Sequence, residues 1–146
     1  LAAVPSLRGH VDGVAIHPDG ANPLVVLAGV RAARLTLGSL GLGSVPLYVT
    51  EFGWTTHPPG ALDYLPEQLR PGYIERSLAA LGHLDCGLAA ALLYAWVTPE
   101  RDTANPEDWF GIHPPGGGSS PDTIAFAAGL HAAASPGPTI SLCAAG

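Results

Sequence analysis

Three short apolar runs alternate with three segments of helical periodicity, and this alternation most constrains the fold of the 146-residue chain. The apolar runs cover residues 11–17, 46–51 and 87–97. Helices are predicted at residues 22–42, 71–84 and 122–134. Strands that alternate with helices form right-handed βαβ units, and such units build a parallel sheet. The sequence therefore predicts an α/β fold.

Capping residues and apolar spacing support the predicted helices. Asn22 and Pro23 form a favourable N-cap and first-turn pair. The buried faces of the first two helices are predicted from apolar residues three or four positions apart, namely Val26, Val30, Ala33, Leu37, Ile74, Leu78 and Leu81. Arg31 and Arg34 fall outside the apolar face of the first helix.

The third apolar run, residues 87–97, is apolar at both odd and even positions. This pattern is typical of a strand that is covered on both faces in a parallel sheet. Tyr48, in the second run, and Tyr94, in the third, are expected to lie in the core.

Charge and composition exclude several classes of function. The chain has six Arg residues, no Lys and twelve acidic residues, which gives a net charge of −6. Without a basic stripe, nucleic-acid binding is not expected. No apolar run approaches the ~20 residues that span a membrane, so no membrane association is expected. A charged fraction of 12% also excludes disorder driven by charge.

Each apolar run ends close to a residue that can take part in chemistry: His17, Glu51 and Trp96. The carboxyl ends of parallel strands share one face, and that face carries the active site of α/β enzymes. We therefore expect the three side chains to converge. His17 would hydrogen-bond Glu51 or a substrate hydroxyl, or would only cap its strand before a proline turn. Trp96 would stack on a sugar ring or fill the core.

Glu51 lies in the motif TEFGW at residues 50–54. A carboxylate at the end of a buried strand is costly unless it is hydrogen-bonded or used. Glu51 is predicted to be a nucleophile towards an anomeric carbon or a general base; the alternative is a Glu that begins a solvated loop. Trp54 is predicted to offer a flat face to a sugar ring. Trp109 is expected to anchor its loop, with a sugar subsite as the alternative.

The sequence predicts neither a metal site nor a nucleotide cofactor. The six histidines are dispersed, without a His-x-x-x-His or Cys-x-x-Cys pair, and no glycine-rich fingerprint follows a strand. Cys86 lies beside an apolar run and is expected to be a buried free thiol. A Cys86–Cys143 disulfide is the one pairing open to the chain.

Residues 47–54 (LYVTEFGW) resemble the seventh strand of the clan A glycoside hydrolases, (β/α)8 barrels that cleave β-linked glycosides with retention. Residues 11–18 and 92–96 resemble the sixth and eighth strands. The resemblance implies a partial TIM barrel over residues 1–134, about its last three βα units, with a Pro/Gly-containing tail at 135–146. It implies Glu51 as the nucleophile, His17, Trp54 and Trp96 as sugar-binding residues, an oligo- or polysaccharide substrate, and no cofactor.

Two features depart from the family pattern. Asp19 stands where such proteins often carry a tyrosine after the His-Pro pair. The family's general acid/base is a Glu that follows an Asn, and no Asn-Glu pair occurs here. We therefore expect the acid/base on N-terminal sequence outside this chain, and an inactive fragment that associates with itself or with the missing barrel half. The family resemblance implies secretion of the full-length protein.

Two other interpretations fit the same residues. In the first, the chain is a carbohydrate-binding or structural α/β module whose strand-end aromatics bind sugar without chemistry. In the second, it is a small doubly wound domain whose polar strand ends are structural.

Overall fold

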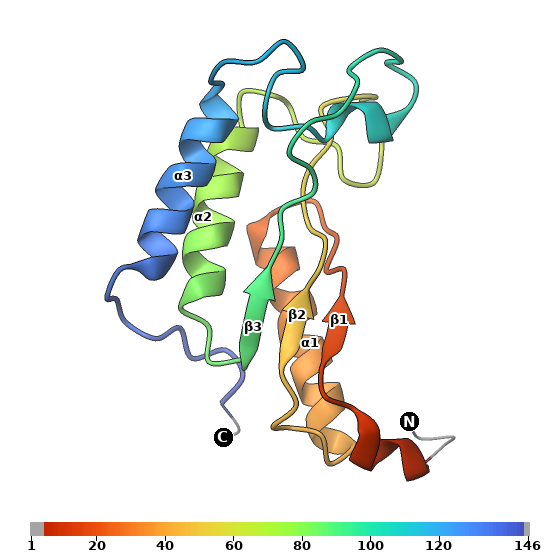
Figure 1. Ribbon diagram of the computed structural model, residues 1–146, viewed down its shortest axis with the longest axis vertical. Coiled ribbons are helices and arrows are strands. Elements are labelled where there is room, and N and C mark those ends of the chain that lie inside the picture. Colours follow the sequence, from red (N-terminus) through yellow and green to blue (C-terminus); the bar gives the residue numbers. More distant parts are fainter. Residues whose placement is uncertain (1–4, 145–146) are drawn as a thin grey trace.

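Three parallel strands form a sheet in the order β1–β2–β3, with helices packed against it (Figure 1). The computed structural model describes residues 5–144. The elements in chain order are the 3₁₀-helix η1 (Pro5–His10), β1 (Val14–Ile16), α1 (Pro23–Ser39), β2 (Leu47–Val49), α2 (Arg70–Gly82), β3 (Leu88–Ala91), the 3₁₀-helix η2 (Pro106–Trp109) and α3 (Pro121–Ala134). Both strand pairs are parallel. The predicted α/β fold with alternating strands and helices is confirmed.

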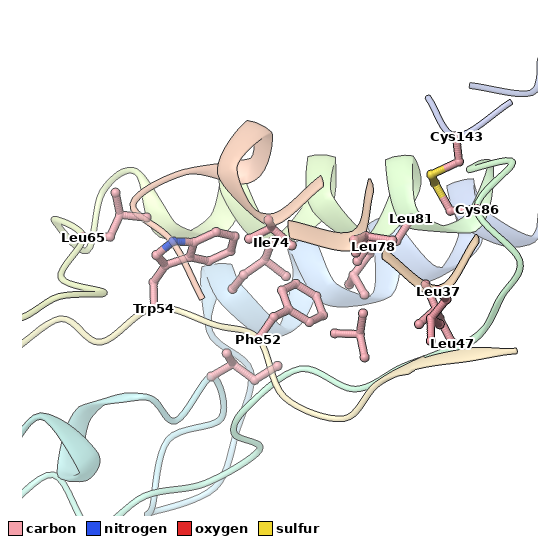
Figure 2. Close-up of a cluster of buried hydrophobic side chains, with 14 of the residues drawn as sticks. Leu37, Leu47, Phe52, Trp54, Leu65, Ile74, Leu78, Leu81, Cys86 and Cys143 are labelled. Carbon is pink, nitrogen blue, oxygen red and sulfur yellow. A yellow bond between two sulfur atoms is a disulfide. The ribbon is translucent and has the colours of Figure 1, made fainter. Parts of the chain in front are cut away.

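The core lies on one face of the central strand, β2. Leu47 and Val49 are buried, whereas Tyr48 between them is exposed on the opposite face. This alternation follows the two-residue period of a strand. Figure 2 shows the buried layer that β2 and the following loop share with α2. The expectation that Tyr48 belongs to the core is wrong, because its position in the strand turns its ring away from that layer.

The first helix begins as its capping residues predict. The Asn22 side chain accepts hydrogen bonds from the backbone N–H groups of Leu24 and Val25, at 3.0 and 3.2 Å. The predicted apolar face is buried at Val26, Val30 and Leu37. None of the helices in the described part of the chain is long and apolar enough to cross a membrane.

Arg34 is buried, although the sequence pattern places it outside the apolar face of the first helix. Its Nε donates to the carbonyl oxygen of Cys86 and its Nη1 to that of Gly43, both at 2.7 Å. Its Nη2 donates to the carbonyl oxygen of Gly87 at 3.3 Å. A buried charged group needs such partners. Arg34 therefore ties α1 to the segment that enters β3.

The third strand is shorter than the apolar run predicts. β3 ends at Ala91, and the side chains of Leu92, Trp96 and Val97 beyond it are exposed. Within β3 the burial is partial rather than complete, with Ala89 exposed. The expectation of a long strand covered on both faces is therefore wrong for this segment.

The C-terminal segment is fastened to the entry of β3. Cys86 and Cys143 form a disulfide, so the expectation of a free thiol at Cys86 is wrong. The Asp85 carboxylate accepts hydrogen bonds from the backbone N–H groups of Leu142, Cys143 and Ala144, at 2.8, 2.7 and 3.0 Å. The bonds from Cys143 and Leu142 are the largest causes that lower the pKa of Asp85.

The outer strands β1 and β3 each have an edge that pairs with no other strand within residues 5–144. Open strand edges template pairing with other chains. We predict that the 146-residue chain associates with itself, and light scattering should detect species larger than a monomer. A monodisperse monomer with a cooperative melt would contradict this prediction.

Candidate active site

The parallel pairing of β1 and β2 brings His17 and Glu51 together. Ile16 pairs with Val49, and the backbone N–H of Thr50 donates to the carbonyl oxygen of Ile16 at 3.2 Å. His17 Nδ1 lies 3.7 Å from Glu51 Oε2, and His17 Nε2 lies 3.0 Å from Thr50 Oγ1. The His17 and Glu51 side chains are about half exposed, at 49% and 47%. A ligand can therefore reach both groups at the carboxyl end of the sheet.

Glu51 lines a pocket of about 190 Å³. The loops that follow the three strands meet there, at one end of the sheet (Figure 1). The lining residues are Asp19, Glu51, Phe52, Gly53, Asp63, Tyr94, Glu107 and Phe110. Four of these eight carry a carboxyl group, and none is an Arg or a Lys. The pocket is therefore rich in hydrogen-bond acceptors and negatively charged.

Tyr94 lines Glu51's pocket together with two other aromatic residues, Phe52 and Phe110. Its hydroxyl donates to Glu107 Oε2 at 3.0 Å, and its ring packs edge-on against Phe110 at 5.3 Å. The hydrogen bond to Glu107 is the main cause that raises the pKa of Tyr94. The expectation that Tyr94 lies in the core is corrected, since β3 ends three residues earlier and the ring turns into the pocket.

Gly53 allows the β2 and β3 loops to approach closely. The backbone N–H of Tyr94 donates to the carbonyl oxygen of Phe52 at 2.8 Å. A Cβ atom at position 53 would collide with the backbone carbonyl oxygen of Tyr94. Backbone atoms cannot move aside as a flexible side chain can. The glycine in the TEFGW motif therefore fixes the distance between Glu51's loop and Tyr94.

Asp63 lines the pocket, although no sequence motif singles it out as a site residue. It lies in a proline- and glycine-containing loop, and its backbone carbonyl accepts from the N–H of Thr55 at 3.0 Å. Burial, followed by the charges of Asp19 and Glu107, raises the pKa of Asp63, while a hydrogen bond from the N–H of Gly20 opposes the shift. Its Oδ1 is buried without a hydrogen-bond partner among the described residues.

Trp54 does not lie at the pocket. Its side chain is 1% exposed, packs edge-on against Tyr73 at 5.5 Å, and donates its indole N–H to the carbonyl oxygen of Gly20 at 2.8 Å. Figure 2 shows it among buried side chains near Leu65 and Ile74. The prediction that Trp54 offers a face to a sugar is corrected, because both faces of its ring serve packing.

Trp96 is 54% exposed, but it belongs to a different depression from Glu51. Its ring stacks on His113 at 5.1 Å and packs against Phe126 of α3 at 6.0 Å. The structure therefore brings together two of the three predicted strand-end residues, His17 and Glu51. At the pocket, the residue from the segment after β3 is Tyr94 and not the predicted Trp96.

Arg70, the first residue of α2, fixes the loop after β3 and the start of α3 by hydrogen bonds. It is buried, and its Nε and Nη2 donate to Asp122 Oδ2 at 2.9 and 2.6 Å. Its Nη1 donates to the carbonyl oxygen of Trp109 at 2.9 Å and its Nη2 to that of Gly111 at 3.0 Å. Burial raises the pKa of Asp122, and the hydrogen bonds from Arg70 oppose that shift.

Trp109 secures the loop that carries Glu107. Its indole N–H donates to the carbonyl oxygen of Asp102 at 2.8 Å, and its ring lies 4.4 Å from that of His57. The buried Thr55 hydroxyl donates to the carbonyl oxygen of Pro106 at 2.8 Å. These contacts support the expected anchoring role of Trp109.

One group in the described part of the chain has ligand types suited to a metal, namely Asp85, Cys86 and Cys143. The two sulfur atoms are joined in the disulfide and are not free thiolates. This group therefore fastens the C-terminal segment and does not offer a metal site.

Comparisons with solved structures lead to glycoside hydrolases. A GH5_18 from Bifidobacterium longum subsp. infantis matches 90% of this chain and 34% of its own, with a TM-score of 0.61 and 15% identity. A monomeric β-xylosidase from Caulobacter crescentus CB15 matches 84% and 30%, with a TM-score of 0.57 and 20% identity. A GH5_18 variant from Bifidobacterium longum subsp. longum ATCC 55813, in complex with Manβ1-4GlcNAc, matches 84% and 30% at a TM-score of 0.51 and 16% identity.

No protein-family model matches the sequence, and no curated protein matches it significantly. The structural matches cover most of this chain but only about a third of each glycosidase. At these identities they establish the fold. The chain shares the α/β fold of about a third of these glycosidases, with a three-stranded parallel sheet and three α-helices.

We predict that Gly53→Ala lowers the free energy of unfolding by about 1–3 kcal/mol, as overpacking does. The new methyl group would collide with the carbonyl oxygen of Tyr94. Chemical denaturation measures the effect. Gly116→Ala is the matched control, because no atom lies within 4 Å of a Cβ at that position. Equal stabilities for the two variants would contradict the close approach at Gly53.

We predict that Asp63→Asn stabilises the protein at neutral pH and not at about pH 3. The folded-state pKa of Asp63 is raised, so its contribution to stability falls as pH rises through that pKa. Below the ordinary pKa of about 3.9, the carboxyl is protonated in both states and the penalty disappears. Melting temperatures at both pH values test this, with the exposed Asp12→Asn as control. A gain that is the same at both pH values would contradict the prediction.

Proposed function

We propose that this chain contributes the nucleophile side of a retaining β-glycosidase site, with Glu51 as the nucleophile. The observation that carries the proposal is Glu51 at the carboxyl end of a parallel strand, beside His17, in a pocket open to ligand. Active sites of (β/α)8 enzymes lie at that end of the strands. The glycosidase fold of the matched structures supports the same assignment.

The proposed reaction proceeds in two displacements. A Glu51 carboxylate oxygen attacks the anomeric carbon, the bond from that carbon to the leaving oxygen breaks, and a general acid protonates the leaving oxygen. The glycosyl ester on Glu51 is then attacked by water, which gives its proton to the same acid/base residue and releases the carboxylate. The two carboxyl groups of such a site stand ~5–5.5 Å apart.

We place the acid/base residue outside these 146 residues. The sequence contains no Asn-Glu pair, and the chain spans about a third of the glycosidases that it matches. General acid/base assistance contributes roughly 10²–10⁴-fold to rate. The chain alone is therefore expected to react only with glycosides whose leaving groups depart without protonation.

The pocket suits a neutral sugar. Its carboxylates accept hydrogen bonds from hydroxyl groups, and the half-buried ring of Tyr94 supplies an aromatic surface. Tyr94 thus takes the sugar-platform role that the sequence assigned to Trp54 and Trp96. One matched structure is a β-xylosidase and another holds Manβ1-4GlcNAc, so β-xylosides and β-mannosides are the substrates to test first.

The test is covalent trapping with 2,4-dinitrophenyl 2-deoxy-2-fluoro-β-xyloside or the corresponding β-mannoside. We expect the mass of one fluoro sugar on the peptide that contains Glu51, and no label on the Glu51→Gln variant. Glu75→Gln, an exposed substitution on α2, is the matched control and should be labelled as the wild type is.

Two outcomes would contradict the proposal. Sugar binding without any covalent label would favour the non-catalytic carbohydrate-binding module. Robust turnover of unactivated β-glycosides that Glu51→Gln abolishes would instead place a complete site, acid/base included, within these 146 residues.

A further inference from the structure

We propose that Thr50 is a positioning residue, whose hydroxyl holds the His17 ring with a proton on Nδ1, the nitrogen that faces Glu51. The inference rests on the proposed function of Glu51. It starts from two distances on opposite sides of one imidazole ring: 3.0 Å from Nε2 to Thr50 Oγ1, and 3.7 Å from Nδ1 to Glu51 Oε2.

A neutral imidazole has one N–H donor and one nitrogen acceptor, and its partners decide which nitrogen carries the hydrogen. Glu51 is acceptor-only when ionised, so it favours a proton on Nδ1. The Thr50 hydroxyl can donate to the remaining lone pair on Nε2. The two contacts together select the Nδ1–H tautomer of His17.

The hydroxyl also suits the protonated ring. An imidazolium donates from both nitrogens, and the Thr50 oxygen can then accept from Nε2–H. Nδ1–H therefore faces Glu51 whichever charge His17 carries. A hydrocarbon side chain at position 50 could neither donate to Nε2 of the neutral ring nor accept from Nε2–H of the protonated ring.

The consequence for Glu51 is orientation. His17 Nδ1 lies nearest to Oε2, at a distance that a small movement shortens to a hydrogen bond. Catalytic hydrogen bonds often tighten in this way when substrate binds. With Oε2 held by His17, the other oxygen of Glu51 remains available for attack on the sugar.

The charged and titratable groups around this pair come from each loop at the pocket. Asp19 lies on His17's own loop, Asp63 on the loop after β2, and Tyr94 and Glu107 on the segment after β3. All three carboxyl groups add negative potential and none offers a donor when ionised. They share with Glu51 the lining of the pocket.

The backbone explains why Thr50 is able to act on His17. The N–H of Thr50 donates to the carbonyl oxygen of Ile16, the residue before His17, and this bond extends the β1–β2 ladder. The two side chains therefore leave adjacent strands side by side. Thr50 precedes Glu51 directly, so two consecutive residues supply both partners of the imidazole.

The experiment combines ring ¹⁵N NMR with trapping on the full 146-residue chain. The variants are Thr50→Val, which keeps the shape, and Thr50→Ser, which keeps the hydroxyl. Thr36→Val, on the exposed side of α1, is the matched control, and His17→Gln assigns the ring signal. At about pH 9, where imidazole is ordinarily neutral, we expect hydrogen mainly on Nδ1 in wild type and Thr50→Ser, and a smaller fraction of that tautomer in Thr50→Val, where Glu51 alone favours it.

The trapping rate with the fluoro glycoside gives the second readout. We expect Thr50→Val to slow labelling of Glu51 by about tenfold, the effect of one neutral hydrogen bond, with Thr50→Ser restored and Thr36→Val unchanged. A wild-type ring with hydrogen on Nε2, or a Thr50→Val variant with wild-type tautomer or wild-type labelling, would overturn the role of Thr50 alone. Absence of labelling in the wild type would reject the proposed function and the role of Thr50 with it.

Discussion

The register between β1 and β2 is the constraint on which the site depends. Ile16 pairs with Val49, so β1 and β2 end at the same level of the sheet. This places His17 beside Thr50 and Glu51. A slip of one residue would turn the side chains of a strand to its other face. The register is held by burial of Leu47 and Val49, because the alternative would expose both to solvent. Core packing and site geometry are thus two results of one strand pairing.

The pocket itself is made by loops whose backbones are fixed by buried groups. Arg70 reaches the carbonyl oxygens of the loop after β3 and the carboxylate at the start of α3, while Gly53 lets the β2 loop approach Tyr94. Binding residues commonly lie on loops that a rigid scaffold positions. Here the carboxyl groups at the pocket are partly solvent-exposed, but the chain segments that carry Tyr94 and Glu107 are held by several hydrogen bonds.

The sequence predicts those features that depend on local chemistry or on strand order. Alternating periodicities give the α/β fold, Asn22 caps its helix, and parallel strands bring His17 to Glu51. The directions of the aromatic side chains could not be predicted in this way. Trp54 and Trp96 follow points where the strands have already ended, so strand alternation no longer says which way a ring turns. The burial of Arg34 and the Cys86–Cys143 disulfide depend on partners far along the chain, which periodicity within one helix or strand does not reveal.

The central claim is that the carboxylate of residue 51 forms a bond to a sugar. A crystal structure of the chain after reaction with a 2-deoxy-2-fluoro β-glycoside tests it most directly. The account predicts continuous density from a Glu51 carboxylate oxygen to the anomeric carbon, with that carbon inverted to the α-configuration and the ring beside Tyr94. A sugar bonded to another residue, or one held in the pocket without a bond to Glu51, would contradict it.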